Sequence, residues 1–113
     1  MISKLLFFIE RVAAYLLGKG WGTATVEKEF AAALSLLEGK KVELCVDIGG
    51  NIGTYTEQIL KQVPSCDVVI FEPAKTNVET LSLKFTNSPN VKIEQCAVSN
   101  EVGDATLYSN EDG

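Results

Sequence analysis

The spacing of apolar positions changes near residue 40 of this chain. From there on, short runs rich in β-favouring apolar residues alternate with segments that carry apolar residues at helical spacing. The runs lack strict alternation, as strands do in a sheet that is covered on both faces. They predict three strands, at residues 42–48, 67–71 and 91–98, with the first one central in the sheet. Residues 105–108 have the composition of a short extra strand.

Two amphipathic helices are predicted between these strands. Thr54 and Glu57 have the spacing of a capping box at the start of the first helix, which ends before Pro64. Thr76 and Glu79 have the same spacing at the start of the second helix. Strands that alternate with helices in this order are typical of parallel βαβ units, so the sequence predicts an α/β fold.

Residues 1–39 are interpreted as a helical extension of the α/β unit at residues 40–113. Apolar residues recur at helical spacing over residues 2–16, and a second helix is predicted from a cap at Thr25 to a terminator at Gly39. The first apolar run is too short for an export signal or for a membrane span. Aromatic residues widen its apolar face, so packing on the domain, contact with a membrane surface and contact with a second copy stay open.

Composition and charge exclude several classes of function. The chain has 113 residues, of which 46% are hydrophobic, with ten basic and fifteen acidic residues and a formal charge of −5. No long block of basic residues offers a surface for nucleic acid. The sequence contains no histidine, which removes histidine bases, Ser-His-Asp triads and the usual zinc sites, so we expect no metal site.

The three cysteines form no CxxC pair and predict free thiols in a reducing cytoplasm rather than a disulfide framework. Cys45 and Cys96 fall within predicted strands, where we expect them to be small apolar core residues. Cys66 falls in a predicted loop, so we expect an ordinary free thiol there.

The segment VDIGGNIG, at residues 46–53, places a glycine-rich turn between the first predicted strand and the helix after it. It lacks the Lys-Ser/Thr pair of a P-loop, and Asn51 stands where a dinucleotide fingerprint needs its second glycine. Gly49 and Gly53 would instead let a ligand without phosphates approach the backbone closely. Asn51 is expected either to hold a left-handed turn or to contact the ligand.

Two carboxylates flank this turn at the tips of neighbouring strands. Asp47 is placed to attract an ammonium group. Glu72 follows the glycines by about 20 residues, the spacing of an acidic residue that accepts hydrogen bonds from ribose hydroxyls. An ammonium group and a ribose diol both occur in S-adenosyl-L-methionine, so the pair predicts a site for that cofactor. Taken singly, Asp47 is explained equally well as a cap of the following helix, and Glu72 as a polar residue at the end of a strand.

The stretches VDIGGNIGTYT, VVIFEPAKTN and NVKIEQCAVSNEVGDATLY, in this order, resemble the FkbM family of class I S-adenosylmethionine-dependent methyltransferases. The resemblance covers residues 42–109, and Gly50 departs from the alanine that the family commonly has. It implies a Rossmann-like fold in which Ala97 lies near the adenine of the cofactor. The cofactor-binding residues expected from the motifs and the resemblance together are Asp47, Gly49, Gly50, Asn51, Gly53, Glu72 and Ala97.

The resemblance also implies further strands, so we expect this chain to be the cofactor-binding half of a longer enzyme, truncated after its third strand, with catalytic residues beyond Gly113. The expected reaction is O-methylation of a hydroxyl on a sugar, a glycan or a natural product. The open edge of the first strand would favour self-association. Two alternatives stay open: an NAD-type dinucleotide-binding domain, and a non-catalytic fragment that binds a membrane surface or a partner through its N-terminal helices.

Overall fold

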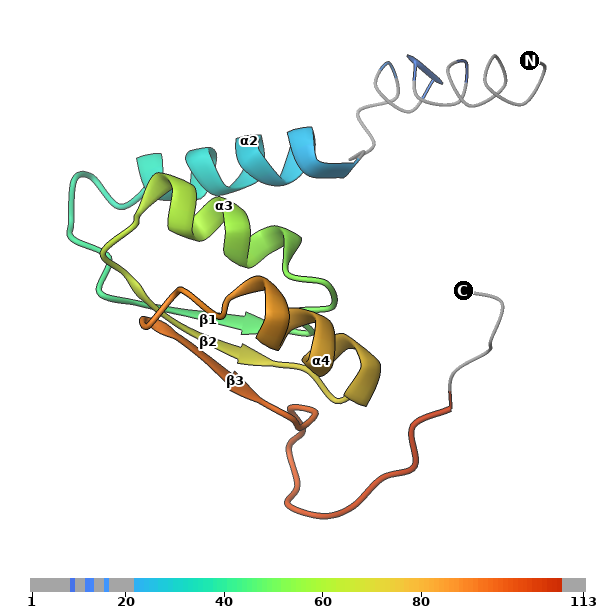
Figure 1. Cartoon of the computed structure of the whole chain (residues 1–113). Helices are drawn as coiled ribbons and strands as arrows, with labels where there is room; N and C mark the ends of the chain where they lie inside the picture. The colour runs from blue at the N-terminus through green and yellow to red at the C-terminus, as the bar shows by residue number, and fades with distance from the viewer. Residues whose placement is uncertain (1–8, 10–11, 14–15, 17–21, 109–113) are drawn as a thin grey trace. The chain divides into compact units, whose positions relative to one another are not determined.

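The computed structural model describes residues 9, 12–13, 16 and 22–108, and the side chains only from residue 26 within the last range (Figure 1). Most of the helix predicted over residues 2–16 therefore lies outside the described residues. The chain divides into two compact units, Met1–Lys40 and Lys41–Gly113, which are described one by one. No helix in the described part of the chain is long and apolar enough to cross a membrane.

The first unit contains the helix α2, Gly22–Ser35. The second predicted helix is thus confirmed, but Thr25 lies inside it and is not its cap. The helix gives way to tighter turns, in which the Leu36 and Leu37 N–H groups donate to carbonyls three residues earlier. Gly39 then adopts a left-handed φ of 78°, the conformation expected of a residue that terminates a helix.

The second unit is built on a parallel sheet of three strands: β1, Leu44–Ile48; β2, Asp67–Phe71; and β3, Val91–Glu94 (Figure 1). The spatial order is β1-β2-β3, and together with the intervening helices it makes the fold α/β and Rossmann-like, as predicted. Among the described residues β2 is the middle strand and β1 lies at the edge, in agreement with the open edge expected for the first strand. The reason is that no described segment pairs with its outer side.

Two helices lie on one face of this sheet, α3 at Thr54–Gln62 and α4 at Lys75–Lys84 (Figure 1). Both are crossovers between parallel strands, and right-handed crossovers in sequence along one sheet direction place their helices on the same face. The core lies between the helices and β2. Its fully or nearly fully buried apolar side chains are Ile59, Cys66, Val68, Ile70, Leu81 and Phe85.

The other face of the sheet is open within the described part of the second unit. Leu44, Val46 and Ile48 of β1 alternate with better buried residues and are 57%, 52% and 64% exposed. Val69 and Phe71 stand beside Val46 and Ile48 in the register and are only half-buried. Within the described residues the prediction that β1 is buried on both faces is therefore wrong, because the helices of the second unit cover one face.

Neither predicted capping box forms. Gly53, with a left-handed φ of 86°, occupies the N-cap of α3, and Ala74 occupies that of α4; neither cap has a side-chain hydrogen bond. α4 begins at Lys75, so Thr76 already lies in its first turn. The Ala74 N–H donates instead to the Glu72 carboxylate, a partner two residues earlier that the capping pattern does not include.

The third strand ends at Glu94, four residues before its predicted end at Val98. Glu94 pairs with Phe71, the last residue of β2, so the ladder has no further partner. The Cys96 N–H then donates to the Glu94 carbonyl, which turns the chain away. Residues 105–108 form no strand, so the extra strand predicted there is wrong.

The cysteines are arranged differently from the prediction. Cys66, in the loop before β2, is fully buried, and its Sγ lies 3.4 Å from the Sγ of the half-buried Cys45. Cys96 is exposed because it lies beyond the end of β3. All three are free thiols, as predicted. The pKa of Cys45 is raised to about 11, mainly by burial and secondly by the hydrogen bond with Cys66.

The packing of α4 yields a matched test of the core. Leu81 is fully buried and Leu83, two residues on, is 79% exposed. We expect Leu81→Ala to lower the free energy of unfolding by about 2 to 5 kcal/mol through lost burial and a residual cavity. Leu83→Ala should change it by no more than about 0.5 kcal/mol. Urea unfolding followed by circular dichroism measures both, and equal effects would contradict the described core.

The thiols should differ in reactivity. At pH 8 we expect alkylation of Cys96 first, slow alkylation of Cys45, whose raised pKa keeps it protonated, and alkylation of Cys66 only on unfolding. Mass spectrometry of samples taken during the alkylation tests this order of reaction, and early labelling of Cys66 would contradict it.

The raised pKa of Cys45 also makes the stability of the fold depend on pH. Because the pKa of Cys45 is higher in the folded chain than its ordinary value of 9.0, its contribution to stability is complete below pH 9 and is lost as the pH rises through 11.

Candidate functional site

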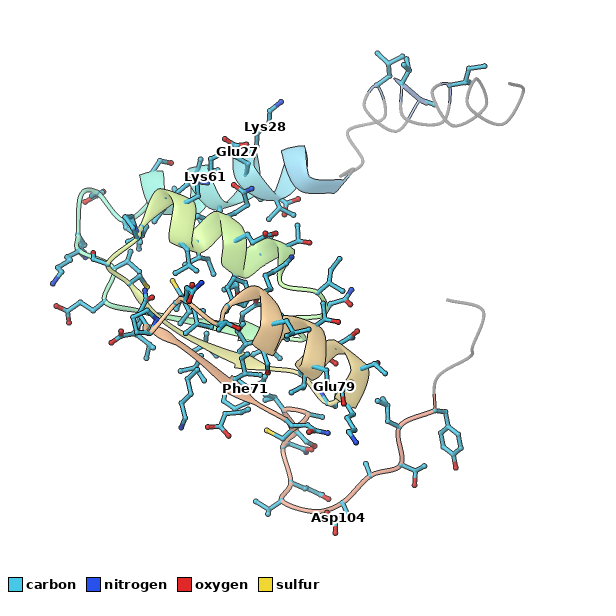
Figure 2. The ribbon with its side chains drawn as sticks, in the orientation of Figure 1. Glu27, Lys28, Lys61, Phe71, Glu79 and Asp104 are labelled. Carbon is cyan, nitrogen blue, oxygen red and sulfur yellow. The ribbon has the colours of Figure 1, made fainter. Side chains whose placement is uncertain are left out.

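The candidate site lies at the carboxyl edge of the sheet, where the loop of residues 49–53 joins β1 to α3. The Phe71 carbonyl, at the end of β2, accepts hydrogen bonds from the N–H groups of Gly49 at 2.8 Å and Gly50 at 3.3 Å. Figure 2 labels Phe71 at this end of the strand. These bonds continue the ladder beyond Ile48 and bring the loop beside Glu72, the next residue after β2. The two predicted motifs thus meet at one edge of the sheet.

Glu72 is the most buried ionisable side chain of this edge, with 5% of its surface exposed. Its Oε2 accepts the N–H of Asn51 at 2.8 Å, and its Oε1 accepts the N–H of Ala74 at 2.8 Å. The carboxylate therefore ties the glycine loop to the start of α4. Each carboxylate oxygen has a second lone pair for a further donor. These two bonds could not be predicted from the sequence, because the backbone partners depend on the loop conformation.

Asp47 lies near the end of β1 and is half-buried. Its Oδ2 accepts the hydroxyl of Thr56 at 2.7 Å, and Thr56 itself is fully buried in the first turn of α3. Thr56 was missed by sequence reasoning, since nothing local marks a threonine whose partner lies on the preceding strand. The bond fixes the carboxylate under the loop and leaves Oδ1 for a ligand.

The three glycines of the loop are required for different reasons. A Cβ on Gly50 would collide with Ile70, and a Cβ on Gly53 would meet Phe85 at 2.7 Å. The loop backbone is thus pressed against the core at these two positions. A Cβ on Gly49 would meet nothing within 4 Å, so this residue needs glycine for its φ of 74° alone. The backbone that is open to a ligand is therefore that of Gly49.

Asn51 adopts the left-handed conformation that the sequence led us to expect as one alternative, with a φ of 48°. Its Oδ1 accepts a hydrogen bond of 3.3 Å from the side-chain amide of Asn77 on α4. Asparagine tolerates this backbone region better than most residues do. Lys84, at the other end of α4, also reaches the loop, where its Nζ donates to the Ile52 carbonyl at 2.7 Å. Neither Asn77 nor Lys84 was identified from the sequence.

A cavity of about 490 Å³ opens beside this edge. Pro73 borders it on one side, and residues 95–107 line the remainder, with Ala97 and Ser99 among them. Asp104, on the loop that follows β3, also lines it and is labelled in Figure 2. Its volume is in the range of about 300 to 1,000 Å³ that small-molecule sites occupy. Within the described part of the chain, no cluster of three acidic or cysteine side chains could hold a metal ion.

The difference between the glycines is testable by unfolding. Gly49→Ala should lower the free energy of unfolding by about 1 to 2 kcal/mol, because the left-handed backbone at this residue disfavours any Cβ. Gly53→Ala should cost a further 1 to 3 kcal/mol or so, because its Cβ also collides with Phe85 and Leu81. Urea unfolding of the two variants gives the difference directly. A loss at Gly49 equal to or larger than that at Gly53 would contradict this packing of the loop.

Comparison with known proteins shows a likeness to a methyltransferase. No protein-family model matches the chain. Over 64 residues the chain is 34% identical to a protein named Methyltransferase 1 from Beauveria bassiana (strain ARSEF 2860). The matched stretch comprises 55% of this chain and 25% of that protein, so the chain corresponds to about a quarter of the length of this relative.

Proposed function

We propose that this chain is the cofactor-binding half of an S-adenosyl-L-methionine-dependent methyltransferase. The observation that carries the proposal is the pair of carboxylates, Asp47 and Glu72, at the ends of neighbouring parallel strands, together with the open backbone of Gly49 in the loop that follows the first of these strands. Crevices beyond the carboxyl ends of parallel strands are where open α/β sheets bind ligands. The likeness to Methyltransferase 1 and the FkbM-like motifs support the same class of enzyme.

The residues at this edge fit the parts of the cofactor. Asp47 keeps one carboxylate oxygen for the ammonium of the methionine end, and Glu72 keeps a lone pair on each oxygen for the ribose hydroxyls. The cavity bordered by Pro73 and Ala97 has apolar and polar surface suited to a flat base such as adenine. Gly49 presents bare backbone in the loop that follows β1.

The bound cofactor would supply a methyl group on a sulfonium, ready for in-line attack by a nucleophile. In this proposal the acceptor is a hydroxyl of a sugar, glycan or natural product, so the reaction is an O-methylation. The residues named here bind and orient the cofactor, and none is assigned a proton-transfer role. The reaction thus depends on positioning, to which Asp47 and Glu72 contribute from this segment.

Calorimetric titration with S-adenosylhomocysteine tests the cofactor site. We expect binding of S-adenosylhomocysteine and none of NAD, because Asn51 occupies the place of a glycine needed for a pyrophosphate. Glu72→Gln should weaken binding about tenfold or more, since it removes a charged hydrogen-bond acceptor. Glu79→Gln, an exposed change of the same type on α4, is the matched control and should bind like the unaltered chain (Figure 2).

A second ligand separates the roles of the two carboxylates. Methylthioadenosine has the adenosine part of the cofactor without its amino-acid end. Asp47→Asn should therefore weaken the binding of S-adenosylhomocysteine and leave the binding of methylthioadenosine unaffected. Glu72→Gln should weaken the binding of both ligands. Binding of NAD in place of S-adenosylhomocysteine would indicate a dinucleotide-binding domain. No binding of any ligand by a folded chain would overturn the proposal for this segment.

A further inference from the structure

Lys84 connects α4 with the glycine loop and with α3, although it lies about 30 residues after them in the sequence. It is the last residue of α4. Its ammonium donates to the carbonyl of Ile52 in the glycine loop at 2.7 Å and lies 3.1 Å from Oε2 of Glu57 in the first turn of α3. With 29% of its side chain exposed, Lys84 is partly removed from water. A lysine at the end of a helix ordinarily serves the helix dipole, but this one is directed at a loop that precedes another helix.

The contacted peptide unit is held at both of its ends. Its carbonyl, from Ile52, receives the Lys84 ammonium, and its N–H, from Gly53, donates to the Gly50 carbonyl at 2.8 Å. Gly53, which belongs to this unit, and Asn51, directly before it, both have left-handed φ values. Glycine adopts either sign of φ readily, so the orientation of this unit depends on its hydrogen bonds rather than on the backbone alone.

The Gly50–Asn51 peptide unit, two units earlier along the chain, is fixed in the same way. Its N–H, from Asn51, donates to Glu72, and its carbonyl, from Gly50, accepts the N–H of Gly53. The loop is therefore a chain of linked hydrogen bonds that starts at the buried Glu72 carboxylate and ends at the Lys84 ammonium. Gly49, the residue whose backbone is open, lies directly before this chain.

We propose that Lys84 is a positioning residue for the cofactor site: it fixes the Ile52–Gly53 peptide unit and thereby the shape of the loop that a ligand meets at Gly49. The inference rests on the proposed function for its ligand, while the loop geometry stands by itself. Lys84 touches no part of the cofactor in this scheme. Its effect passes through the loop backbone.

The test combines S-adenosylhomocysteine titration with hydrogen exchange of the loop amides. Lys84→Met keeps the apolar stem and removes the donor and the charge. We expect affinity to fall about three- to tenfold, the net worth of one ordinary hydrogen bond, because the site is partly exposed. Exchange of the Gly53 amide should become faster. Lys84→Arg retains the charge and N–H donors and should restore most of the affinity, which a loss of helix packing alone would not allow.

Two control variants separate the loop contact from charge and from the ion pair. Lys92→Met removes a lysine of the same charge whose exposed partner is Glu94 on β3, and should leave affinity and loop exchange unchanged. Glu57→Gln breaks the ion pair but leaves the bond from Lys84 to the Ile52 carbonyl, so its effect should be small, as for other partly exposed pairs. An effect of Glu57→Gln as large as that of Lys84→Met would overturn the inference in favour of a link between α3 and α4.

The two readouts also separate this inference from the proposed function. Unchanged exchange and unchanged affinity in Lys84→Met would overturn the positioning role. If Lys84→Met speeds exchange at Gly53 but the unaltered chain binds no S-adenosylhomocysteine, the contact of Lys84 with the loop is supported and the cofactor assignment is overturned. Thermal melting of each variant confirms that the compared chains are folded.

Discussion

The buried carboxylate of Glu72 is the interaction on which the carboxyl edge of the sheet depends. A charge with 5% exposure is tolerated only when hydrogen-bond donors surround it, and two backbone N–H groups from separate loops meet that need. Removal of either loop from its place would leave one of the two buried carboxylate oxygens without its donor. The position of the glycine loop and the start of α4 are thus set together, by one side chain at the tip of the middle strand.

β2 organises the rest of the second unit. It pairs with a strand on each side, contributes Val68 and Ile70 to the core beneath α3 and α4, and ends in the carbonyl that anchors the glycine loop. The two edge strands are much less enclosed. Burial on one face and exposure on the other divide the sheet into a side that holds the fold together and a side whose apolar residues remain open.

Much of the fold could be predicted from the sequence because periodicity is a local property. The order of strands and helices and the meeting of Asp47 and Glu72 at one edge all followed from short runs and from the rule that parallel strands end together. The capping boxes, the end of β3 and the burial of Cys66 could not be predicted, because each is decided by a partner elsewhere: Glu72 for the Ala74 N–H, Phe71 for the end of the ladder, Cys45 beside Cys66.

The structure gives two of the loop glycines a role other than the expected one. A tight loop was expected to leave room for a ligand at Gly49 and Gly53. At Gly53, as at Gly50, the space is instead filled by the protein's own core, and Gly49 alone faces open space. Lys84, Asn77 and Thr56 were missed for the same cause as the caps, since their partners are far apart in sequence or depend on the folded loop.

The bond between Thr56 and Asp47 has a consequence for folding as well as for the site. Side chains alternate between the two faces of a strand, so a slip of β1 by one residue against β2 would carry Asp47 to the open face and put Ile48 in its place beneath α3. The buried hydroxyl of Thr56 would then lose its acceptor and remain unpaired. This bond therefore selects a single alignment for an edge strand whose apolar residues on the open face could slide with little penalty.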